Sequence, residues 1–157
     1  MHEVMLIDGN RSELTSFMEV IKHIKGGAKC TYASSGKQAL DLLHHMLPGY
    51  IFMHFNEEAL KTLSAVRFER RLRTIKIFLY SDTISEEMSK MAKMLGAAGC
   101  IEMDPELNGL IHKFRAIFSP DLLPAYVLLK YNCPAVIFGE RSPNLADLET
   151  EAGLEQQ

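Results

Sequence analysis

Five short apolar runs alternate along the chain with longer segments of helical period, and this alternation constrains the fold more than any other feature. A short continuous apolar run suits a strand that is buried on both faces. Apolar residues spaced three and four apart suit a helix with one buried stripe. Strands that alternate with helices pair in parallel, because each helix returns the chain to the start of the next strand. The sequence therefore predicts an α/β domain with a parallel sheet covered by helices.

The predicted strands are rich in apolar, β-branched and aromatic residues, and turn or polar residues follow them. They cover residues 4–7, 29–33, 50–53, 75–80 and 100–103. The third run, Tyr50-Ile51-Phe52-Met53, is the most continuously apolar of the five. We expect it to form the central strand, since only a central strand has both faces and both edges covered.

Helix start signals precede the predicted helices. Two of them have the spacing of a capping box, in which side chains at the N-cap and three residues later satisfy free backbone N–H groups: Asn10 with Glu13, and Ser35 with Gln38. The others are single polar side chains expected at the N-cap: Asn56, Ser85 and Asp104. Pro105 directly after Asp104 is expected at the first helical position, where its missing N–H costs nothing.

Length and composition predict one domain followed by a different kind of segment. A chain of 157 residues, 47% of them hydrophobic, can bury one ordinary core. Residues 119–157 contain four prolines that interrupt regular structure, and six acidic residues against two basic ones give them a net charge of −4. We therefore expect a domain over residues 1–118 and an acidic, proline-containing extension over 119–157. The extension is expected to be partly apolar and then mobile from about Glu140.

Bulk properties argue against several classes of function. A net charge of −3 gives no support for binding to nucleic acid or to an anionic membrane surface. No apolar stretch approaches the roughly 20 residues of a membrane span, and the first residues, MHEVMLIDGN, lack the pattern of a secretory signal. The three cysteines include no CxxC pair, which fits a reducing cytoplasm. We find no nucleophile–base pair and no glycine-rich phosphate loop, so we do not expect an enzyme.

The order and spacing of five segments resemble the receiver domains of bacterial two-component response regulators. The segments are VMLIDGN, SSGKQALDLL, LPGYIFMHFN, IKIFLYSDTISEE and LGAAGCIEMDPE, and together they extend the resemblance over about residues 3–118. The resemblance implies a flavodoxin-like, doubly wound sheet of five parallel strands in the order 2-1-3-4-5. It also implies a role in phosphorelay signal transduction in a bacterial pathway.

The resemblance further implies where the phosphorylation pocket would lie and which of its parts are missing. In the family an acidic pair after the first strand holds magnesium, and an aspartate ending the third strand accepts the phosphoryl group. A hydroxyl residue ends the fourth strand, and a lysine ends the fifth. The metal and the lysine offset the charge of the phosphoryl oxygens. Aligned onto this chain, these positions are occupied by Asp8, Gly9, His54, Ser81 and Met103.

Only Asp8 and Ser81 match the family at these positions. Magnesium prefers several hard oxygen ligands, so Asp8 alone is a weak metal candidate even with Glu57 or Glu58 nearby. An aspartyl phosphate cannot form where His54 replaces the aspartate. We expect His54 to fill the vacated position and to hydrogen-bond Asp8. The chain is therefore interpreted as a degenerate pseudo-receiver that needs no cofactor and acts through protein–protein interaction.

Two further expectations come from the resemblance. The family commonly dimerises and signals through the face made by the fourth helix, the fifth strand and the fifth helix. On this chain that face would include Met88, Met91, Cys100 and Ile101, and a protein partner or a second copy of the chain would bind there. The alternative function is a phosphoryl-carrying or ligand- or metal-sensing protein that uses a repurposed pocket around His54 and Asp8.

Overall fold

The computed structural model describes residues 1–118 and 135–137, and in them strands and helices alternate as predicted. The strands are β1 (His2–Ile7), β2 (Ala28–Ala33), β3 (Tyr50–His54), β4 (Lys76–Ser81), β5 (Gly99–Glu102) and β6 (Ala135–Ile137). The helices are α1 (Ser12–Ile21), α2 (Gly36–Leu42), α3 (Glu57–Phe68), the short 3-10 helix η1 (Arg70–Leu72), α4 (Glu86–Met94) and α5 (Leu107–Phe118). No helix among the described residues is long and apolar enough to cross a membrane.

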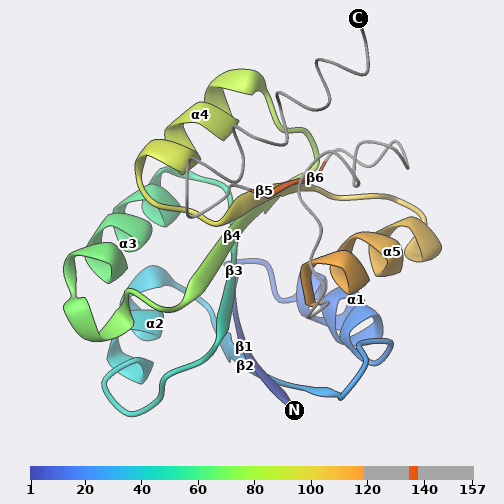
Figure 1. Ribbon diagram of the computed structural model, residues 1–157, viewed down its shortest axis with the longest axis horizontal. Coiled ribbons are helices and arrows are strands. Elements are labelled where there is room, and N and C mark those ends of the chain that lie inside the picture. The colour runs from blue at the N-terminus through green and yellow to red at the C-terminus, as the bar shows by residue number, and fades with distance from the viewer. Residues whose placement is uncertain (119–134, 138–157) are drawn as a thin grey trace, which may run out of the picture.

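The strands form one sheet in the order β2-β1-β3-β4-β5-β6 (Figure 1). The first five strands are parallel and confirm the predicted order 2-1-3-4-5. The sixth strand was not predicted, and it pairs antiparallel with β5 at the edge of the sheet. The rest of the predicted extension, residues 119–134 and 138–157, lies outside the described residues.

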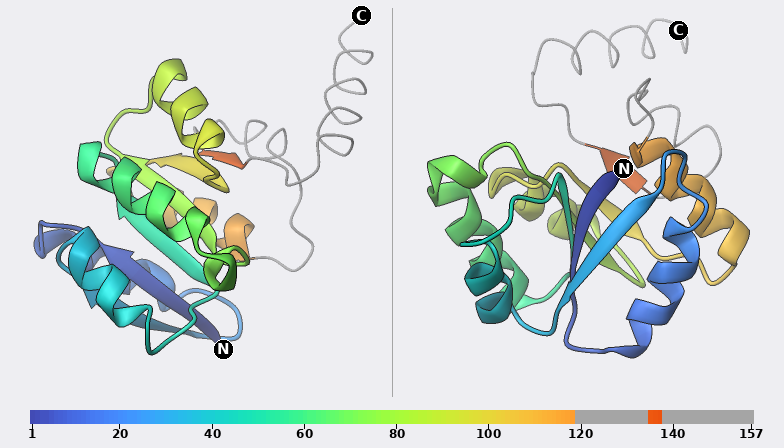
Figure 2. Two further views of the ribbon diagram at one scale, coloured as in Figure 1. Left: turned by 90° about the vertical axis from the view of Figure 1, so that its left-hand side faces the viewer. Right: turned by 90° about the horizontal axis from the view of Figure 1, so that it is seen from below.

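Helices cover both faces of the sheet and create two separate apolar layers (Figures 1 and 2). One layer lies between the sheet and helices α1 and α5, and includes Phe52 and Phe78 of the central strands together with Phe114 of α5. The other lies under α2, α3 and α4, and includes Ile51 and Met53. Because neighbouring residues of a strand point to opposite faces, the continuous apolar run of β3 contributes to both layers.

Three of the predicted N-caps are confirmed by hydrogen bonds to the first turn of their helix. The side chains of Ser35, Asn56 and Ser85 accept from the backbone N–H three residues later. The second half of the Ser35 box is absent, since the Gln38 side chain accepts from the N–H of Ser34 instead, at 2.6 Å. Caps formed by one local hydrogen bond are the kind that sequence spacing can predict.

Two helix starts were predicted wrongly. The helix α1 begins at Ser12 with no side-chain cap, because the Asn10 side chain accepts from the N–H of Ser12 at 3.1 Å in a local turn. The Asp104 side chain likewise accepts from the N–H of Glu106 at 2.9 Å, and α5 begins only at Leu107. Short polar side chains favour such two-residue turns as well as caps.

The first turns of α2 and α3 meet at Gly36, where the chain has no room for a side chain. A Cβ atom at this position would lie 2.0 Å from Oγ1 of Thr62. The Thr62 hydroxyl is itself held in place, because it donates to the Glu58 carbonyl at 3.0 Å. The Glu58 carboxylate accepts from the N–H of Gly36 at 2.9 Å. This junction fixes the start of α3, directly beside the end of β3.

We predict that Gly36→Ala lowers the free energy of unfolding by about 1–3 kcal/mol, because the added methyl group overpacks the junction. The double variant Gly36→Ala with Thr62→Ala should recover much of the loss. Chemical denaturation measures both. Gly49→Ala is the matched control, since a Cβ atom there would meet only the Glu3 carbonyl oxygen at an ordinary 3.8 Å. Equal losses at positions 36 and 49 would contradict the steric account.

Candidate functional site

The carboxyl ends of the parallel strands gather the predicted pocket residues around one cavity. Asp8 and Gly9 follow β1, His54 ends β3, Ser81 ends β4 and Met103 follows β5. All five line a cavity of about 340 Å³. They meet because parallel strands end at the same edge of the sheet, which is where doubly wound folds place their ligands.

Asp8 is the most enclosed charged group of the cavity, with 5% of its surface exposed. Its Oδ1 atom accepts from the backbone N–H of Asn10 at 2.8 Å, and its Oδ2 atom accepts from the hydroxyl of Tyr80. Its backbone carbonyl accepts from the hydroxyl of Tyr32 at 2.5 Å. Both carboxylate oxygens therefore have a protein donor, as a buried charge requires.

The Tyr80 hydroxyl is held in its neutral form. Burial, followed by the hydrogen bond to Asp8, raises the pKa of Tyr80 well above its ordinary value of 10.0. Only 3% of the residue is exposed. The hydroxyl consequently remains a donor to Asp8 throughout the physiological pH range.

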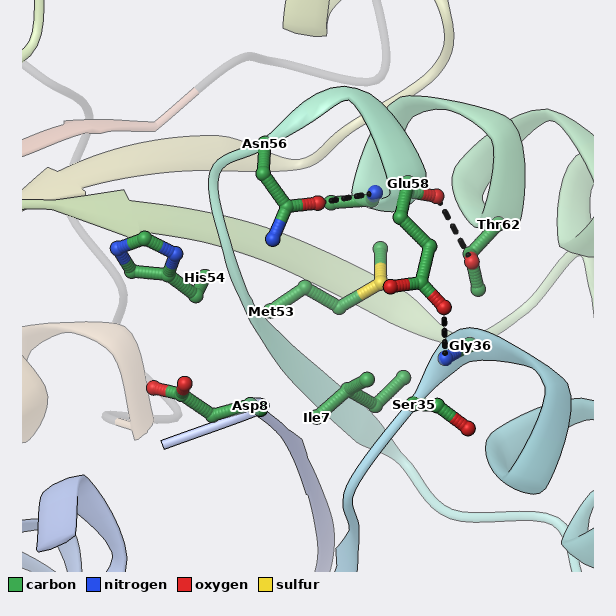
Figure 3. Close-up of a pocket in the computed structure, with 11 residues that line it drawn as sticks. Ile7, Asp8, Ser35, Gly36, Met53, His54, Asn56, Glu58 and Thr62 are labelled. Carbon is green, nitrogen blue, oxygen red and sulfur yellow. Dashed lines mark hydrogen bonds between the residues drawn. The ribbon is translucent and has the colours of Figure 1, made fainter. Parts of the chain in front are cut away.

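His54 lies half-buried at the end of β3, on the same side of the sheet as Asp8 (Figure 3). Its ring meets the Tyr80 ring edge to face, with centroids 5.6 Å apart. The expected hydrogen bond between His54 and Asp8 is wrong. Within residues 1–118 the donors to the Asp8 carboxylate are Asn10 and Tyr80, and they leave the imidazole to pack against the aromatic ring.

The charges around the cavity are negative. Asp8, Glu13 and Asp82 line it, and no lysine or arginine of the described residues does. The Lys113 ammonium group of α5 lies near the end of β5, but it donates to the Glu102 carbonyl at 2.6 Å and its side chain does not line the cavity. A phosphoryl group placed here would face carboxylates without a compensating cation.

The predicted weak cation site combines Asp8 with Glu57 or Glu58, and of these Asp8 and Glu58 line a common small pocket (Figure 3). The Glu58 carboxylate points to the start of α2, where it binds the N–H of Gly36 (Figure 3). Within the described part of the chain, no three histidine, cysteine or acidic side chains are grouped so that they could hold a metal ion.

No protein-family model and no curated protein sequence matches the chain. Solved structures do match. A chemotaxis response regulator of Vibrio cholerae is 18% identical with a TM-score of 0.66, and the match covers 74% of this chain and 98% of that one. A response regulator in red light signalling of R. palustris is 14% identical with a TM-score of 0.69, covering 78% and 96%. A response regulator from Thermotoga maritima is 18% identical with a TM-score of 0.65, covering 75% and 98%.

The fold is that of a receiver domain. The match covers 96–98% of each of the three structures, so it spans nearly a whole receiver fold. At these identities the likeness establishes the architecture, and the chemistry of the pocket has to be read from this chain's own side chains.

The face predicted for partner contacts is only partly available in this receiver fold. Met91 of α4 is 47% exposed, and Met94, one turn further, is 85% exposed. Met88 is half-buried, and its sulfur accepts from the N–H of Ser85. Cys100 and Ile101 of β5 are fully buried, so their side chains cannot reach a partner. The same burial raises the pKa of the Cys100 thiol to about 12.

Sequence reasoning missed the tyrosines that complete the pocket. Tyr80 stands inside an otherwise apolar strand, and a buried tyrosine requires a partner for its hydroxyl. That requirement was a usable signal, although it does not name Asp8 as the partner. Lys113 gave a similar signal in the sequence, because it stands next to apolar residues that face the core from α5. The structure places it in the interior, with 1% of its surface exposed.

We predict that Tyr80→Phe lowers the free energy of unfolding by about 1–3 kcal/mol at neutral pH, because it removes a donor from a buried carboxylate. Tyr50→Phe is the control, since the Tyr50 ring packs against Phe52 and Phe118 without a hydroxyl contact to Asp8. Equilibrium denaturation measures the difference. A Tyr80→Phe protein as stable as the Tyr50→Phe protein would contradict the role given to the hydroxyl.

The same hydroxyl predicts a dependence on alkaline pH. Because the pKa of Tyr80 is raised in the folded chain, folding favours the protonated hydroxyl. Its contribution is complete below the ordinary value of 10.0 and decreases as the pH rises above it, where the unfolded chain ionises first. The stability difference between wild type and Tyr80→Phe should therefore shrink above that pH. A constant difference across this range would contradict the assignment.

Proposed function

We propose that the chain is a non-catalytic signalling module of the response-regulator type, which binds proteins and does not depend on aspartyl phosphorylation. The receiver fold supports the general class. The observation that carries the finer claim is the engagement of both Asp8 oxygens by Tyr80 and Asn10 at the edge where a receiver would hold its metal.

The first requirement of aspartyl phosphorylation is a carboxylate acceptor at the end of β3. An aspartyl phosphate forms when a carboxylate oxygen attacks phosphorus and the leaving group departs with the electron pair. His54 ends β3, and its imidazole packs on the Tyr80 ring. No carboxylate stands at that strand end, so the acyl phosphate of the family has no atom on which to form.

The second requirement is a carboxylate that is free to bind magnesium. To bind magnesium, Asp8 would have to release the Tyr80 hydroxyl, the N–H of Asn10, or both. Gly9 adds no second carboxylate beside it, and magnesium demands near-ideal octahedral oxygen ligands. The Tyr80 hydroxyl is buried, so leaving it without an acceptor adds a further cost of about 1–3 kcal/mol.

A protein partner would contact the exposed side of α4. Loss of the phosphorylation chemistry leaves surface contacts as the means of signalling, and α4 offers the exposed methionines Met91 and Met94. Methionine side chains are flexible and polarizable, which suits contact with protein surfaces. We infer protein partners in the cytoplasm of a bacterial pathway.

We predict that acetyl phosphate and magnesium leave the intact mass of the wild-type chain unchanged. A rebuilt variant that combines Gly9→Asp, His54→Asp and Met103→Lys should gain the mass of one phosphoryl group. A side chain fits at position 9, where a Cβ atom would meet only the Ser34 carbonyl at 3.9 Å. The single variant His54→Asp is the matched control, which should gain much less because it lacks the metal and lysine positions.

A phosphoryl adduct on the wild-type chain would contradict this proposal. If the adduct disappeared in His54→Gln, it would support the alternative, a phosphoryl-carrying or ligand-sensing pocket around His54 and Asp8. The observation in favour of the alternative is the size of the cavity, about 340 Å³, which falls within the range of roughly 300–1,000 Å³ typical of small-molecule sites. Its acidic lining argues against phosphate as that ligand.

A further inference from the structure

The sheet carries one strand more than the five-stranded pattern, and this strand covers an edge. β6 pairs antiparallel with β5, with Gly99 opposite Ile137, Cys100 opposite Val136 and Ile101 opposite Ala135. It lies beside β5 at the far end of the sheet from β2 (Figures 1 and 2). Without it, β5 would be the edge strand.

The backbone edge of β5 is covered along its whole length by two different groups. β6 pairs with residues Gly99 to Ile101. The next carbonyl, that of Glu102, accepts from the buried ammonium group of Lys113 at 2.6 Å. The pairing with β6 therefore stops where the lysine begins, and β5 is left with no open stretch of backbone.

An uncovered β5 would be a template for pairing. Unpaired N–H and C=O groups of an edge strand recruit other strands unless charges, prolines or bulges prevent it. β5 has the sequence GCIE, with no proline and no lysine, and the side chains of Cys100 and Ile101 are fully buried. Only the backbone would face outward, and it would be held rigid by the core on both sides.

A second copy of the chain fits this edge without any charge conflict. In a two-fold antiparallel pairing of β5 with itself, residues directly opposite point to the same face of the sheet, and Cys100 and Ile101 point to different faces. Cys100 therefore lies opposite Cys100 of the second copy, and Gly99 lies opposite Ile101. In this register the single charge, Glu102, does not lie opposite its own copy, so like charges directly opposite are avoided. The Glu102 carboxylate is also engaged, since it accepts from the N–H of Ile84 at 3.0 Å.

We propose that β6 is an intramolecular cover that prevents β5 from pairing with β5 of a second copy. A strand of three residues can compete with a second copy because β6 belongs to the same chain as β5. The tether gives β6 an effective concentration on the order of millimolar at the β5 edge. Displacement of β6 then turns the β5 edge into a dimerisation surface. This inference stands on the pairing of β5 with β6 and does not depend on the Asp8 pocket. Either the inference or the proposed function can therefore fail while the other holds.

The test displaces β6 in the full-length chain. Val136→Pro removes the N–H opposite Cys100 and disfavours a strand at that point. Val136→Thr is the matched control, because it keeps both the N–H and a β-branched side chain. Hydrogen exchange of the β5 amides and sedimentation velocity are measured for wild type and both variants, at low and at high micromolar concentration.

Wild type and Val136→Thr should be monomeric, with protected β5 amides at both concentrations. In Val136→Pro the β5 amides should exchange about tenfold faster or more at low concentration. At high concentration a dimer should form and protection should return. β5 amides that remain protected in dilute Val136→Pro would overturn the cover, and exposed amides in a chain that stays monomeric would overturn the dimerisation surface.

A second variant locks β6 onto β5 with a disulfide instead of displacing it. Val136→Cys places a thiol opposite Cys100, within the reach of a disulfide across an antiparallel pair. With Cys30 and Cys133 changed to serine and glutathione disulfide as the oxidant, we expect an intramolecular disulfide and a chain that remains monomeric at high concentration. The same chain with Cys100→Ser is the control. A disulfide-linked dimer in place of the intramolecular disulfide would overturn the cover independently of how Val136→Pro folds.

Discussion

The carboxylate of Asp8 is buried at the end of β1, and the pocket is arranged around the need to satisfy it. One oxygen binds the N–H of the turn that begins at Asn10, and the other binds a tyrosine from β4. The hydrogen bond from Tyr80 crosses above β3, which lies between the two strands. It therefore links three neighbouring strands at the edge where they end. A metal ion in a working receiver would offset the same negative charge; here a neutral hydroxyl binds it.

The residues at the other strand ends also differ from those of a working receiver. A hydroxyl cannot neutralise a transferred phosphoryl group, and neither His54 nor Met103 supplies an acceptor carboxylate or a lysine cation. The cavity remains because the receiver fold creates it: strands that end together leave a crevice whatever residues line it. The chain thus has the receiver architecture and a cavity of about 340 Å³, and the charged side chains that line it are acidic.

The sequence predicted those features that depend on local pattern. The alternation of apolar runs and helical stripes yielded the order of elements, and Asn56 and Ser85 cap their helices as their spacing required. The Asn10 and Glu13 box failed because a competing local turn engages the same side chain. The bond between Tyr80 and Asp8 could not be predicted, since it joins positions far apart in sequence. β6 was missed because an open backbone edge, rather than its own pattern, makes a strand of Ala135–Ile137.

The buried ammonium group of Lys113 has a mechanical consequence for α5. It ties α5 to the end of β5, and the apolar side of the same helix adds Leu110, Phe114 and Ile117 to the core. Sliding α5 by one turn would break all of these contacts together, so the helix behaves as a fixed platform. By contrast, α4 buries only Ala92. The packing of α4 against the sheet therefore resists displacement less than the packing of α5.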